Sequence, residues 1–153
     1  MAEKADQRVR RFVASRRWHY RVARERAAIG RFADELEADL AAAGVVAAAR
    51  LSLATVLDEL LANVVMHAHA VRGPMHVRLR WCNGELVARL RYFGTAFDPT
   101  AQPAPQHPTT IAEARTGGVG IAMVRAMTRE FGWRHARGEN HLRVRVGEAG
   151  NSC

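Results

Sequence analysis

Two alternating runs joined by Asn83-Gly84 constrain the fold of this chain more than any other stretch. In MHVRLRW (75–81) and ELVARLRYF (85–93), apolar residues alternate with polar ones that are mostly arginine. Asn-Gly tolerates the positive φ angles of a tight hairpin turn, so the two runs are expected to pair as antiparallel strands. Their alternation predicts one face packed on a core and one face in water.

The layer that covers the apolar face is expected to be helical. Apolar residues recur at helical spacing from about His19 to Ala43, and again in LSLATVLDELLANVVMHAH (51–69), where neither Gly nor Pro interrupts them. A third helix is expected over IAMVRAMTREF (121–131), and a closing hairpin over WRHAR (133–137) and HLRVRV (141–146). This order predicts an α+β two-layer sandwich, with helices on one face of a mixed, mainly antiparallel sheet.

Length and charge indicate one domain with short extensions. We divide the 153 residues into a basic N-terminal segment (1–18), a globular domain (19–147) and a C-terminal tail (148–153). The net charge is +8, and residues 1–31 carry most of the excess. Nucleic-acid binding through the N-terminal segment stays open. An Arg-rich composition without that role is favoured, because no aromatic-interleaved binding motif accompanies the charge.

The sequence also bears on cellular location. No apolar run is long enough to cross a bilayer, and the N-terminus MAEKADQRVRR has no hydrophobic signal region. These features predict a cytoplasmic protein with no membrane partner. Cys82 and Cys153 have no neighbouring metal-ligand pattern, so free thiols are expected.

Glu59 and Asn63 are the first candidate site residues. They lie four residues apart in the second helical run, so a carboxylate and a carboxamide project from the same stripe of the helix. Such a pair can share a chemical task. It can also belong to the solvated face of an amphipathic helix, together with Ser52, Thr55 and Asp58, and the helix alone leaves both interpretations open.

A glycine cluster, Gly117-Gly118-Val119-Gly120, precedes the third helix. Small residues let a phosphate approach the backbone, and the unpaired N–H groups and positive dipole end of a helix favour an anion there. The same cluster would also suit an ordinary helix start. Before it lies a loop (94–118) that holds all but one of the prolines, and loops of this length are usually functional or mobile.

Three segments together resemble a known family. DELLANVVMHAH (58–69), FGTAFDP (93–99) and GGVGIAMVRAMTREFGWRHARGENHLRVRV (117–146) resemble the GHKL ATPase superfamily, and within it the small anti-sigma factor serine/threonine kinases of bacteria. The resemblance covers roughly residues 20–146. It implies the GHKL (Bergerat) ATP-binding fold with ATP and Mg²⁺ as cofactors. It also implies a sigma factor or a small anti-sigma-factor antagonist as partner, and a homodimer.

The resemblance implies a role for each candidate residue. Asn63 would ligate Mg²⁺ through its amide oxygen, and Glu59 would orient or deprotonate the attacking hydroxyl. The residues implied in nucleotide binding, besides Asn63, are those of the turn after the second strand and of the glycine cluster: Tyr92, Gly94, Phe97, Gly117, Gly118, Val119 and Gly120. The loop from Thr100 to Thr116 would act as a lid.

Tyr92 departs from the family pattern. The family has an aspartate two residues before the glycine of this turn, where it accepts a hydrogen bond from the exocyclic amine of adenine, and this chain has a phenol there. Three functions therefore stay open. They are an ATP-dependent kinase that also binds a regulatory partner, a non-catalytic interaction module of the same fold, and a nucleic-acid-binding protein.

Overall fold

The Asn83-Gly84 turn joins two strands in the middle of a five-stranded sheet. Strand β2 (Arg72–Cys82) pairs with β3 (Glu85–Phe93) in antiparallel register, so that Cys82 faces Glu85 across the turn. Asn83 and Gly84 have φ values of 52° and 81°, as a hairpin turn of this kind requires. The predicted hairpin is confirmed.

The computed structural model describes residues 16–101 and 118–148, and the sheet contains three further strands. These are β1 (Arg16–Val22), β4 (Glu130–Ala136) and β5 (Glu139–Gly147). The spatial order is β1-β2-β3-β5-β4, and all four pairings are antiparallel. Residues 1–15, which make up most of the basic N-terminal segment, lie outside the described residues.

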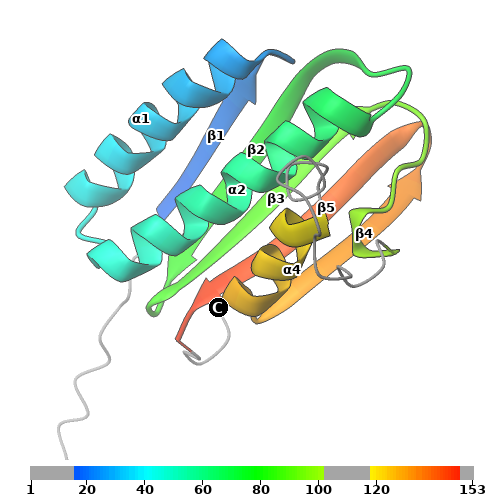
Figure 1. The fold of residues 1–153 in the computed structure, drawn as a ribbon. Helices are drawn as coiled ribbons and strands as arrows, with labels where there is room; N and C mark the ends of the chain where they lie inside the picture. Colours follow the sequence, from blue (N-terminus) through cyan, green and yellow to red (C-terminus); the bar gives the residue numbers. More distant parts are fainter. Residues whose placement is uncertain (1–15, 102–117, 149–153) are drawn as a thin grey trace, which may run out of the picture.

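Helices cover one face of this sheet (Figure 1). They are α1 (Arg26–Ala42), α2 (Ala47–His67) and α4 (Gly118–Met127), and a short 3-10 turn, η1 (Pro99–Ala101), follows β3. Apolar side chains of α2 such as Leu53, Leu57 and Leu60 are fully buried against the inward-facing residues of β2, β3 and β5. The α+β two-layer sandwich is confirmed.

Two helix boundaries differ from the prediction. The first helix begins at Arg26 and not near His19, because Tyr20 and Val22 are buried in β1, paired with Val77 and Met75 of β2. The third helix ends at Met127, and Phe131 lies in β4 opposite Val144. In both places the alternating burial of a strand prevails over a weaker helical spacing.

Two smaller findings concern the membrane and the cysteines. Within the described ranges, no helix is long and apolar enough to cross a bilayer. Cys82 is disulfide-bonded, so the expectation of a free thiol was wrong at this residue. Cys153, the other residue of this prediction, lies outside the described residues.

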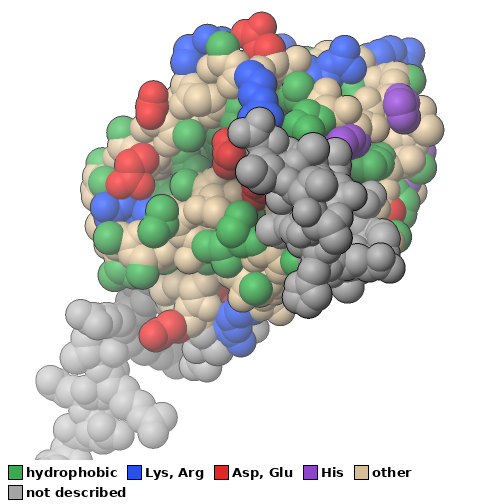
Figure 2. Space-filling view, viewed as in Figure 1, with side chains coloured by type: hydrophobic (Ala, Val, Ile, Leu, Met, Phe, Trp, Pro, Cys, Tyr) green, Lys and Arg blue, Asp and Glu red, His purple; other side chains and the backbone are tan. Residues whose placement is uncertain are grey.

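The sheet face that points away from the helices, here called the outer face, is strongly basic. Arg78, Arg89 and Arg143 are directly opposed on β2, β3 and β5. Two residues further along the strands in either direction, the same face carries Arg80 and Arg145 on one side, and His76, Arg91 and His141 on the other. The helix-covered side instead carries acidic and basic side chains among exposed apolar ones (Figure 2). Residues 32–153 hold thirteen arginines against twelve acidic residues, so their near-balanced charge conceals the basic character of the outer face.

Candidate functional site

Helix α2 places Asn63 at the edge of the core and Glu59 one turn before it. Asn63 is only 8% exposed, and it is one of few buried polar residues in the described part of the chain. Its neighbours Leu60 and Val64 are buried as well, so the helix cannot rotate to bring the amide into water. The interpretation of this stripe as a merely solvated face therefore does not hold for Asn63.

Buried polar atoms without a hydrogen-bond partner are few in the described residues. They are Asn63 Nδ2, Tyr92 OH and Arg143 Nε, of which the first two lie on the helix-covered side. A buried donor left unpaired costs about 1–3 kcal/mol, so native proteins seldom keep one without a use. Both of these side chains belong to the set that the sequence resemblance places around a nucleotide.

Tyr92 lies on β3, opposite Asn140 of β5, and is 1% exposed. Burial raises the pKa of its phenol to about 12, so the hydroxyl keeps its proton at neutral pH. A protonated phenol can donate one hydrogen bond and accept another, whereas the family's carboxylate only accepts. Tyr92 and the family's aspartate would therefore form different hydrogen bonds with a nucleotide base.

Helix α4 packs beside α2, and Gly120 is the point of closest approach to Glu59. A Cβ at Gly120 would overlap the Oε2 atom of Glu59 and would lie 2.7 Å from its Cδ and 3.4 Å from its Oε1. Only glycine leaves room for the carboxylate against the first turn of the helix, where its negative charge also suits the dipole. The structure thus brings Glu59 and Gly120 together.

The other members of the glycine cluster are described only in part. Gly118 is the first residue of α4, as a helix start at the cluster requires. Gly117 lies outside the described residues, and so does most of the predicted lid, which falls in 102–117. For Val119 only its place in the helix is described.

Asn140, which the sequence analysis did not identify, fixes the turn that follows β3. Its side chain is fully buried, and its Oδ1 accepts hydrogen bonds from the Phe97 backbone N–H at 3.0 Å and from Trp133 Nε1 at 3.1 Å. Its Nδ2 donates to the carbonyl oxygen of Thr95 at 2.9 Å. The available signal was the alternation of β5, which continues inward from Leu142 to Asn140, although Gly138-Glu139-Asn140 reads as a turn.

Gly94 lets the same turn lie against the segment that follows α2. A Cβ there would come within 3.1 Å of the His69 carbonyl oxygen and 3.3 Å of Val71 Cγ2. The next residue, Thr95, donates its backbone N–H to that carbonyl at 3.0 Å. The turn carrying Gly94 and Phe97 is therefore held between the segment after α2 and β5.

The donor set suits a nucleotide that brings its own metal. Mg²⁺ is commonly held by one or two protein oxygens together with phosphates and waters, so a single amide oxygen from Asn63 is an adequate protein contribution. In the described ranges no group of three or more His, Cys, Asp or Glu residues could hold a metal alone. Two surface hollows lie elsewhere, on the outer face.

Comparison with known proteins agrees with this architecture. A profile of the histidine kinase-like ATPase domain matches residues 22–146. The serine/threonine-protein kinase BtrW of Bordetella bronchiseptica is 30% identical over 95 residues, which cover 61% of this chain and 67% of that protein.

A solved structure shares the fold. The RsbU and RsbW domains of Rv1364c from Mycobacterium tuberculosis superpose with a TM-score of 0.62 at 15% identity. The match covers 86% of this chain but only 32% of that longer chain. Because the profile spans most of the sequence, from the end of β1 to the end of β5, the chain belongs to the histidine kinase-like ATPase domain family.

Proposed function

We propose that this protein is an ATP- and Mg²⁺-dependent serine/threonine kinase that also binds a regulatory partner. One observation carries the proposal: buried Asn63, whose Nδ2 has no hydrogen-bond partner, and the carboxylate of Glu59 lie one turn apart on α2, with Glu59 against the start of α4. Phosphoryl transfer depends mostly on positioning and on stabilising charge, and these groups can provide both.

Each residue has a distinct part in this mechanism. Asn63 would hold Mg²⁺, which neutralises phosphate charge when it is bound. Glu59 accepts the proton of the attacking serine or threonine hydroxyl, or orients that hydroxyl by a hydrogen bond. The first turn of α4, from Gly118 to Gly120, offers unpaired N–H groups to the phosphates. The turn through Gly94 and Phe97 would border the base.

The absence of the family's aspartate at Tyr92 raises a second candidate, a non-catalytic interaction module of the same fold. If its buried hydroxyl cannot replace the family's carboxylate, the loss of one hydrogen bond to adenine weakens binding by about ten- to a hundredfold. Such a module would retain the partner surface and lose the nucleotide. The unpaired Tyr92 hydroxyl favours the kinase, because it leaves a donor available to a base.

The partner belongs to the proposal as well. BtrW is named a serine/threonine-protein kinase, and the structural match includes an RsbW domain. We propose a sigma factor, or a small antagonist protein carrying the acceptor hydroxyl, as the partner of this chain in the cytoplasm. A homodimer stays a prediction, and so does nucleic-acid binding through residues 1–18.

Calorimetric titration with ATP and Mg²⁺ separates the two candidates. The kinase proposal expects saturable binding in the micromolar range that is lost in Asn63→Ala. It also expects that binding to persist in Ser52→Ala, a matched change on the same helix. A flat titration at millimolar ATP would favour the interaction module. Glu59→Ala should keep nucleotide binding and lose phosphoryl transfer, and unchanged transfer would remove Glu59 from its assigned role.

A further inference from the structure

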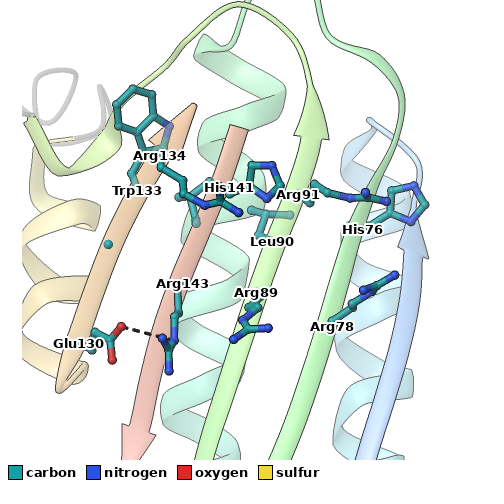
Figure 3. Close-up of a pocket in the computed structure, with 12 residues that line it drawn as sticks. His76, Arg78, Arg89, Leu90, Arg91, Glu130, Trp133, Arg134, His141 and Arg143 are labelled. Carbon is teal, nitrogen blue, oxygen red and sulfur yellow. Dashed lines mark ion pairs between the residues drawn. The ribbon is translucent and has the colours of Figure 1, made fainter. Parts of the chain in front are cut away.

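Arginines line two adjoining hollows on the outer face, here together called the groove, and Figure 3 shows the side chains that line the larger one. The two hollows, of about 590 and 490 Å³, adjoin at Arg78 and Arg89, and their lining residues extend from β1 to β4. Figure 3 shows Arg78, Arg89 and Arg143 side by side on three neighbouring strands. Their backbone positions are directly opposed in the register, so three like-charged side chains stand in one row across the strands.

This charge is only partly neutralised within the molecule. Arg143 Nε lies 3.3 Å from Glu130, and Arg91 NH1 lies 3.5 Å from Glu139. Arg78 and Arg89 are exposed, and neither forms an ion pair with an acidic residue of the described chain. Directly opposed like charges destabilise a sheet, so an anion placed over these two side chains would relieve repulsion and gain new pairs.

Burial and the positive charge of the arginines lower the pKa of two histidines that line the same hollow, His76 and His141. The pKa of His76 is lowered by burial and then by Arg91 and other nearby cations. The pKa of His141 is lowered by burial and by Arg134, against an opposing effect of Glu139. Both imidazoles are therefore held toward the neutral form, which leaves the guanidinium groups as the fixed charges of the groove.

We infer that the groove binds an acidic segment of a protein partner. Guanidinium groups pair with carboxylates in a planar, two-pronged geometry, and the groove is lined by arginine without any lysine. Neighbouring strands are about 4.8 Å apart, and residues three or four apart on a helix are separated by about 5–6 Å. An acidic helix laid across the strands would thus place about one carboxylate over each strand.

Other occupants fit this surface less well. A second copy of the chain would bring two basic faces together, which repel. The outer face is about 19 Å wide from β1 to β4, which exceeds the roughly 12 Å width of a DNA major groove. The aromatic side chains of the described part of this face are already engaged: His19 stacks on His76 at 5.3 Å between centroids, Trp133 directs its indole N–H to buried Asn140, and Trp18 packs against the core.

A labelled peptide of about 20 residues with glutamate at helical spacing provides the test, by fluorescence anisotropy with the full chain. In Arg78→Gln/Arg89→Gln the Kd should rise about tenfold, because two ion pairs are lost. The matched control, Arg26→Gln/Arg31→Gln, removes two exposed arginines from α1 and should change Kd by less than about twofold. Equal loss in both pairs, no loss in the first, or no binding by wild type would overturn the inference.

A duplex DNA probe in the same assay distinguishes the remaining occupant. Tighter binding of DNA than of the peptide, weakened by the Arg78 and Arg89 changes, would assign the groove to nucleic acid and overturn the inference. Thermal unfolding checks that the double variant is folded. Its Tm should equal or exceed that of wild type, since the substitutions remove opposed like charges from β2 and β3.

Discussion

Replacing Gly120 by alanine tests whether the Glu59 carboxylate must lie against the first turn of α4. The new Cβ would overlap Oε2 and lie 2.7 Å from Cδ, where ordinary contact begins at 3.4 Å. The carboxylate must therefore retreat by about 1 Å, and a misplacement of that size can slow a reaction about a hundredfold. Folding should tolerate the change, because Glu59 can rotate away and alanine is up to about 1 kcal/mol better than glycine inside a helix.

The assay combines thermal unfolding with transfer of phosphate from ATP, measured on the acceptor protein or as slow ATP hydrolysis. For Gly120→Ala we expect a Tm at or above that of wild type, with turnover reduced about a hundredfold. Gly30→Ala on α1 is the matched control, because nothing lies within 4 Å of its new Cβ. It should gain the same helix stability and keep full turnover.

Wild-type turnover in Gly120→Ala would refute the reasoning, since the position of the carboxylate would then be immaterial. A double variant gives a second check. If both substitutions act through the same carboxylate, Gly120→Ala should slow Glu59→Ala no further. An additional large loss would mean that Gly120 serves another purpose, such as the approach of a phosphate to the backbone.

Three further predictions concern groups around the site and the sheet. Asn140→Ala should lower the unfolding free energy by about 3 kcal/mol and Tm by about 9 °C, because it leaves two N–H donors without an acceptor; an unchanged Tm would show that water replaces them. Tyr92→Phe should raise stability by about 1 kcal/mol, as it removes an unpaired buried hydroxyl, and should weaken nucleotide binding; a lower Tm would contradict this. Hydrogen bonds from Arg145 lower the pKa of Glu85 in the folded protein from the ordinary value of 4.5. This stabilises the fold above pH 4.5, and the stabilisation should be lost as the pH falls through the lowered pKa. In urea unfolding, the free energy of unfolding of Glu85→Gln should therefore depend less on pH in this range.

Much of the fold could be predicted from local pattern. The hairpin at Asn83-Gly84 and the helix carrying Glu59 and Asn63 have strong, uninterrupted periods, and both are confirmed. The errors fell where two periods compete over a few residues. Tyr20 and Phe131 are in strands because each pairs with a residue of a neighbouring strand. The residues around them in the sequence do not show which strand that will be.

The candidate site was predictable only in part. Glu59, Asn63 and the glycine cluster could be proposed as site residues because their residue types and spacing are distinctive, and the structure places Glu59 against Gly120. The bracing role of Asn140 could not, since it depends on a turn more than forty positions earlier in the chain that accepts and donates its hydrogen bonds. The basic groove was hidden for a similar reason. A count of charged residues along the sequence does not separate the two faces of the sheet. Only the register of the strands shows that Arg78, Arg89 and Arg143 lie on the same face.

The buried amide of Asn140 ties the turn after β3 to the closing hairpin, and this has a consequence for local unfolding. If the two segments opened independently, their amide protons would exchange with solvent at unrelated rates. Because one side chain bonds the backbone of Thr95 and Phe97 and the indole of Trp133, we expect both segments to open as one cooperative unit. The turn after β3 would then take its protection from exchange from the most C-terminal strands of the sheet.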